Sequence, residues 1–139
     1  MTAPSCTIFV CVSCGRKRDE AGIVTEGPGP KFFEALNRTL TESGNVCLEA
    51  YPVECLAVCK RPCTIAFAAE GKWTYIVGDL DETAHIGDVV SAALSYAASE
   101  NGIVPRKERP PSFRKGVIAR VPPLPAEMIA AQVQGGTPG

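Results

Sequence analysis

Five of the seven cysteines form two tight groups in the sequence, Cys11-x2-Cys14 and Cys55-x3-Cys59-x3-Cys63, and 40 residues separate the groups. The first group ends the apolar run 8–10, and the last cysteine opens the run 64–67. Thiolates bind soft metals, and short spacings let one loop supply two ligands. A fold can therefore bring the two loops, each at the end of a predicted strand, to one point.

Composition bounds the class of protein. The chain has 139 residues and a formal net charge of −1, so we expect one main domain and no nucleic-acid partner. No apolar stretch approaches the length of a membrane span, and no secretory signal is visible at residues 1–5. We therefore expect a cytoplasmic protein without a membrane partner. In that compartment an odd number of cysteines favours metal or redox chemistry over structural disulfides.

Apolar runs and helix breakers predict an α/β domain with the order β-α-β-β-β-α. The strand–helix–strand unit predicts a parallel pair, and Glu70-Gly71-Lys72 predicts an antiparallel hairpin. Together they predict a thioredoxin-like fold, with a mixed four-stranded sheet and flanking helices. The predicted strands are 6–12, 46–51, 63–69 and 73–77, and the predicted helices are 31–43 and about 81–99, the latter capped by Asp81 or Thr83.

The composition changes after residue 104. We therefore divide the chain into a thioredoxin-like domain, 1–104, and a proline-rich basic C-terminal extension, 105–139. Residues 105–123 hold six basic side chains and one acidic one, a net charge of +5, which leaves −6 for the rest of the chain. Three interpretations stay open: this segment docks an acidic partner, docks an acidic face of the same domain, or is a solvated extension. A short helix is predicted at 127–134.

Basic residues flank both cysteine groups. Arg16-Lys17-Arg18 follows the first pair, and Lys60-Arg61 lies inside the second group. Cations beside thiols favour the thiolate that a metal or an iron–sulfur cluster requires. The x2 spacing is common in zinc sites, whereas an x3 spacing is less usual there. Spacing alone therefore favours an iron–sulfur cluster over zinc only modestly.

The stretch Cys55-Leu-Ala-Val-Cys59-Lys-Arg-Pro62, followed by Gly71-Lys72-Trp73-Thr74-Tyr75, resembles the second ligand half of thioredoxin-like [2Fe-2S] ferredoxins. From Cys11 to Pro123 the chain also resembles a bacterial family of small predicted metal-binding proteins, a domain of unknown function. Some members of that family are associated with cobalamin biosynthesis genes. The resemblance implies an iron–sulfur electron-transfer protein that serves a redox partner protein, in a biosynthetic pathway such as cobalamin synthesis, and it leaves a homodimer open.

We assign Cys11, Cys14, Cys55 and Cys59 as ligands of a [2Fe-2S] cluster. The x2 spacing of the first pair is shorter than in the ferredoxins that the chain resembles. Cys63 is either an alternate metal ligand or a small residue entering a buried strand. The remaining two cysteines fall in apolar segments and are predicted to pack in the core; they are Cys6 and Cys47.

Three functions compete. The first is an electron carrier, which is not an enzyme. The second is a module that binds zinc or carries another metal without a redox role. The third is a thiol–disulfide oxidoreductase that uses Cys11 and Cys14, but Gly15 and a loop rich in breakers follow this pair where such enzymes have a helix. His85 is the single histidine, which excludes a Rieske-type centre and favours a surface or capping role.

Overall fold

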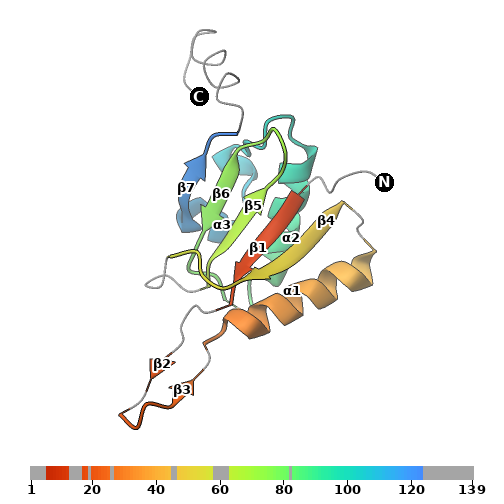
Figure 1. The fold of residues 1–139 in the computed structure, drawn as a ribbon. Helices are drawn as coiled ribbons and strands as arrows, with labels where there is room; N and C mark the ends of the chain where they lie inside the picture. Colours follow the sequence, from red (N-terminus) through yellow and green to blue (C-terminus); the bar gives the residue numbers. More distant parts are fainter. Residues whose placement is uncertain are drawn as a thin grey trace.

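The computed structural model describes residues 6–12, 17–18, 20–25, 27–44, 47–57, 63–81 and 83–123. Its centre is a mixed five-stranded sheet in the order β4-β1-β5-β6-β7 (Figure 1). β1 pairs with β4 in parallel and with β5 antiparallel, and the pairs β5–β6 and β6–β7 are antiparallel. The strands are β1 (Cys6–Cys11), β4 (Leu48–Val53), β5 (Ile65–Ala68), β6 (Thr74–Val77) and β7 (Val117–Val121).

Two long helices pack against each other and against β1 and β4; they are α1 (Gly29–Ser43) and α2 (Ile86–Ala98). Prolines at 28 and 30 set the start of α1, and Gly44 ends it with a left-handed φ of 68°. A short helix, α3 (Pro111–Gly116), contacts α2, and a 3-10 turn, η1 (Arg106–Glu108), precedes it. Within the described residues, no helix combines the length and apolarity that crossing a membrane would require.

The core lies between the helices and one face of the sheet. Cys6, Ile8 and Val10 alternate along β1 and are fully buried, because successive strand residues point to opposite faces. They form one cluster with Phe32 and Leu36 of α1. This face therefore holds β1 rigidly from its start to its end at Cys11.

The α/β class, the parallel β1–β4 pair and the β5–β6 hairpin confirm the predicted architecture. The predicted strand number was wrong: the sheet has five strands in place of four, because β7 covers the edge that β6 would otherwise expose. α2 begins at Ile86, later than predicted, since Asp81 holds a turn that precedes the helix. The loop rich in breakers that was predicted after Cys14 also contains a small hairpin, β2 (Lys17–Arg18) and β3 (Val24–Thr25).

The described part of the predicted C-terminal extension packs on the domain. Phe113 of α3 is 3% exposed, and its ring stacks on Phe67 of β5 with the centroids 5.6 Å apart. β7 then extends along β6. Residues 105–123 thus share the core and the sheet of the preceding residues. The predicted helix at 127–134 lies outside the described residues.

Candidate metal centre

The ends of three adjacent strands bring cysteines of both groups to one edge of the sheet. Cys11 is the last residue of β1, Cys55 follows the end of β4 by two residues, and Cys63 precedes β5 by two residues. β1 runs parallel to β4 and antiparallel to β5, so the three positions lie at the same edge. We call the edge marked by Cys11, Cys55 and Cys63 the cysteine edge.

Backbone hydrogen bonds fix the strands at this edge. The N–H of Val12 donates to the carbonyl oxygen of Val53 at 2.9 Å, which joins the end of β1 to the end of β4. The N–H of Cys11 donates to the carbonyl oxygen of Thr64 at 3.0 Å, which joins it to the start of β5. The loops that carry the two cysteine groups therefore start at strand ends that are hydrogen-bonded to one another.

Cys11 is 1% exposed, and its Sγ lies 3.8 Å from the carbonyl oxygen of Glu54. The start of α1 packs closely on this residue: a Cβ built at Gly29 would lie 2.5 Å from the carbonyl oxygen of Cys11. Glycine at position 29 thus lets the helix approach the end of β1. Gly29 was not among the predicted site residues, although its place between two prolines at a helix start is a visible signal.

Cys55 is exposed, and the backbone N–H of Ala57 donates to its Sγ at 3.1 Å. Ala57 has a φ of 63°, a left-handed conformation that is uncommon outside glycine. This turn aims an amide dipole at the sulfur, where it stabilises negative charge. Hydrogen bonds from amides to sulfur are also one of the levers that set cluster potentials. The sequence does not reveal this donor, because alanine carries no turn signal.

Cys63 is 1% exposed and belongs to the core cluster. Its N–H donates to the carbonyl oxygen of Leu80 at 3.2 Å, and the N–H of Leu80 donates back to its carbonyl oxygen at 3.3 Å. This pairing joins the start of β5 to the loop that follows β6. Burial does not separate the two interpretations of Cys63, because Cys11 is equally buried.

The other two predicted ligands, Cys14 and Cys59, lie outside the described residues. Within the described part of the chain, no three His, Cys, Asp or Glu side chains are grouped so that they could hold one metal ion. The structure thus positions Cys11 and Cys55 of the predicted set and the alternate ligand Cys63, and it leaves the complete ligand set a prediction.

The remaining two cysteines lie at the opposite end of β1 and β4. Cys6 begins β1 and is fully buried, and its N–H donates to the carbonyl oxygen of Cys47 at 3.2 Å. Burial raises the pKa of the Cys6 thiol to about 12, so this group stays protonated at neutral pH. The predicted core role of Cys6 is confirmed, while Cys47 is half-buried just before β4.

Asp81 and His85 serve the turn before α2. The Asp81 carboxylate accepts the Thr83 hydroxyl at 2.7 Å and the N–H groups of Thr83 and Ala84 at 2.8 Å. The Thr83 hydroxyl and these N–H groups lower the pKa of Asp81 to about 2. The N–H of Asp81 donates to Nδ1 of His85 at 2.8 Å, so His85 has the predicted local structural role.

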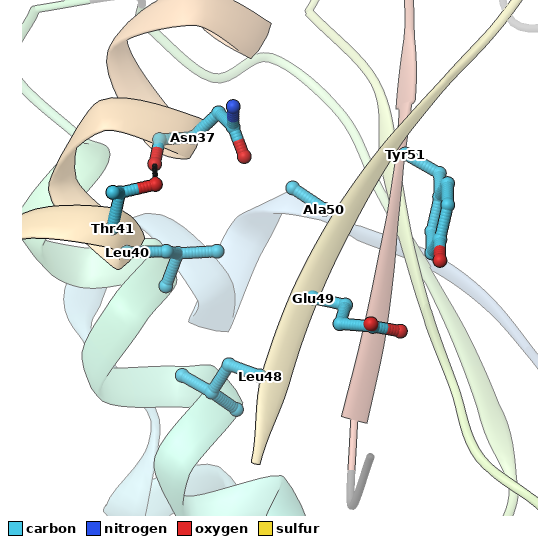
Figure 2. A pocket seen from close by; sticks show the side chains of 7 residues that line it. All are labelled: Asn37, Leu40, Thr41, Leu48, Glu49, Ala50 and Tyr51. Atoms are coloured by element: carbon cyan, nitrogen blue, oxygen red, sulfur yellow. Dashed lines mark hydrogen bonds between the residues drawn. The ribbon is translucent and has the colours of Figure 1, made fainter. Parts of the chain in front are cut away.

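An open pocket of about 280 Å³ lies between α1 and β4 (Figure 2). Figure 2 shows Leu48 and Ala50 of β4 directed toward Leu40 and Thr41 of α1, while Tyr51 points to the other side of the strand. Among the described residues, no cysteine lines this pocket. It is therefore separate from the chemistry of the cysteine edge.

Comparisons with known proteins support the fold. A solved structure titled as a thioredoxin-like [2Fe-2S] ferredoxin from Aquifex aeolicus superposes with a TM-score of 0.58 over 87% of this chain and 96% of that chain, at 15% sequence identity. At this identity the likeness shows the fold alone. No curated protein matches the chain. A family model described as "Protein of unknown function (DUF1636)" matches residues 8–123, and the chain therefore belongs to this family.

Proposed function

We propose that this protein is an electron carrier that binds one [2Fe-2S] cluster through Cys11, Cys14, Cys55 and Cys59. The observation that carries the proposal is the convergence of the two cysteine-bearing loops at one edge of the sheet. The fold of a thioredoxin-like [2Fe-2S] ferredoxin supports it independently of that geometry.

The described residues fit such a group in two respects. Thiolate is the usual ligand of these clusters, and the cysteine edge presents thiols from separate loops. The Ala57 N–H beside Cys55 Sγ supplies a donor to a sulfur that would carry negative charge. When bound, the cluster would supply one-electron transfer. The protein's own part is to hold the thiols, to set the charge around them and to keep Cys11 away from water.

Cys63 remains the alternate ligand in this proposal. It lies at the same edge as Cys11, but its backbone is fixed on both sides by Leu80, and its side chain belongs to the core cluster. Cys55 in contrast is exposed on a turn that can adapt to a ligand. We therefore consider Cys55 a better ligand candidate than Cys63.

Anaerobic reconstitution with iron and sulfide tests the proposal. We expect about two iron and two sulfide per chain and visible absorption that dithionite bleaches. Serine at position 11, 14, 55 or 59 should remove or strongly alter this spectrum, since an open iron site would remain. Serine at Cys6 is the matched control and should leave the spectrum unchanged.

Stoichiometric zinc without sulfide, even after reconstitution, would overturn the cluster in favour of the metal-binding alternative. Loss of the spectrum in Cys63→Ser together with its retention in Cys14→Ser would overturn the ligand assignment. A content of four iron per chain would keep electron transfer and change the cluster type.

A further inference from the structure

Four exposed cations belong to η1 and α3, and the Arg114 guanidinium, which donates to the carbonyl oxygen of Lys107 at 3.4 Å, links the two elements. They are Arg106, Lys107, Arg114 and Lys115, and we call them the basic face. None of them forms an ion pair with an acidic side chain in the part of the chain that the structure describes. The Asp88 carboxylate contacts α3 through the Ser112 hydroxyl and not through one of these cations.

The basic face is a fixed surface. Phe113, between the two pairs of cations, is buried against Phe67, and the Ser112 hydroxyl donates to the Asp88 carboxylate of α2 at 2.8 Å. Arg109, the neighbouring cation, is not counted in the basic face because its side chain is held by contacts within the domain. Its Nε donates to the carbonyl oxygen of Val104 at 2.9 Å, and its guanidinium lies 5.5 Å from the centre of the Tyr75 ring.

A ladder of backbone contacts places one end of this surface at the cysteine edge. Cys63 pairs with Leu80, two residues after Gly78, and the N–H of Gly78 donates to the carbonyl oxygen of Gly116 at 2.9 Å. Gly116 is the last residue of α3, directly after Arg114 and Lys115. A Cβ there would lie 2.9 Å from the carbonyl oxygen of Gly78, so glycine permits this contact. Arg114 and Lys115 thus precede a strand start that lies at the same edge of the sheet as Cys63, two strands away from β5.

The charge distribution favours a protein partner over a polyanion such as nucleic acid. The chain carries 15 acidic side chains, of which one lies within residues 105–123, so the molecule as a whole repels a long polyanion. A compact acidic patch on a partner protein can contact the basic face without approaching the acidic side chains in the rest of this chain. Transient electrostatic docking of this kind raises association rates more than affinity, which suits an electron carrier.

We infer that the basic face docks an acidic protein partner beside the cysteine edge. The inference rests on the proposed function, because it assigns the surface through which the carried electron is exchanged. The occupant is an acidic redox protein, and the four cations supply its recognition.

A first experiment measures binding of a short acidic peptide, hexa-L-glutamate, to the full chain by calorimetry, which does not require a cluster. We expect binding at 10 mM salt that weakens at least about tenfold at 200 mM, since the Debye length falls from about 30 Å to below 10 Å. Lys115→Glu and Arg114→Glu should each weaken binding about threefold or more. Arg38→Glu, an equal change of charge at an exposed site of α1, should alter it less than twofold.

A second experiment follows oxidation of the dithionite-reduced, reconstituted protein by ferricyanide, an anionic one-electron oxidant. Lys115→Glu should slow this reaction severalfold at low salt and should speed oxidation by the cation hexaamminecobalt(III), while Arg38→Glu should change neither rate by twofold. Unchanged rates in Lys115→Glu would overturn the placement of the surface beside the centre.

The outcomes separate this inference from the proposed function. Equal losses of hexa-L-glutamate binding in Arg38→Glu and Lys115→Glu, or tighter binding of duplex DNA than of hexa-L-glutamate, would overturn the inference. If binding is lost selectively in the basic-face variants and the protein takes up only zinc, the docking of an acidic partner stands and the electron-carrier proposal is overturned.

Discussion

Replacing Gly29 by alanine tests whether the start of α1 positions the end of β1. The new Cβ would lie 2.5 Å from the carbonyl oxygen of Cys11 and 2.9 Å from two backbone atoms of Val12. Backbone atoms cannot rotate away, so either the helix or the Cys11 strand must shift. Pro30 adds a second conflict, because a residue with a Cβ before proline disfavours the helical conformation.

The size of the effect follows from these contacts and from a matched control. Forcing an extra carbon into a packed site costs about 1–3 kcal/mol of unfolding free energy. Gly87 lies in α2, and a Cβ there would meet no atom within 4 Å. Gly87→Ala should therefore stabilise the protein by about 0.4–1 kcal/mol, through a reduced entropy of the unfolded chain. The two variants should move the unfolding free energy in opposite directions.

Urea unfolding followed by the circular dichroism of the helices measures this difference. With an ordinary urea dependence, the midpoints of the two variants should differ by on the order of 1 M. Iron content after reconstitution should fall in Gly29→Ala and stay at the wild-type level in Gly87→Ala. Equal midpoints would refute the close approach, and a destabilised Gly29→Ala with full iron content would refute its role in positioning Cys11.

Two further predictions concern the core. Because burial raises the pKa of Cys6 from 9.0 to about 12, its contribution to stability is complete below pH 9 and is lost as pH rises toward 12, at about 1.4 kcal/mol per pH unit. The unfolding free energy of Cys6→Ala, measured by denaturant titration at a series of pH values, should lack this pH-dependent loss. If wild type and variant show the same pH dependence, the buried thiol is contradicted. Phe113→Ala should cost about 3–5 kcal/mol of unfolding free energy in the same assay, since its ring is buried against Phe67, and a cost below about 1 kcal/mol would show that α3 is loosely attached.

The sequence predicted most of the elements that are long and strongly patterned. α1 follows from an apolar stripe between Pro30 and Gly44, and β1 from a continuous apolar and β-branched run. The strands β2 and β3 have two residues each, too few to show a period, so they were predicted as loop. Pattern reasoning therefore succeeds where a segment is long enough to bury a face of its own.

The fifth strand was missed for a different reason. The prolines and cations that surround β7 resemble a solvated segment, although Val117, Ile118 and Val121 give it strand character. Pro111 at the start of α3 was also a helix signal. The local sequence does not show that β6 would have an unpaired backbone edge without β7, because this depends on the order of strands in the completed sheet. Likewise the cysteine edge depends on strand order, with β1 between β4 and β5, and no spacing of cysteines encodes that order.

The position of Cys11 also bears on two uses of cysteine in this kind of fold. In a thiol–disulfide oxidoreductase the reactive cysteine lies in a partly exposed site where a substrate disulfide can reach its sulfur. Here Cys11 ends β1 and is 1% exposed, and the start of α1 packs on its backbone carbonyl oxygen. A metal that coordinates a thiol deprotonates it and does not need this access for a protein substrate. The burial of Cys11 therefore supports the proposed ligand role over that of an exchanging thiol.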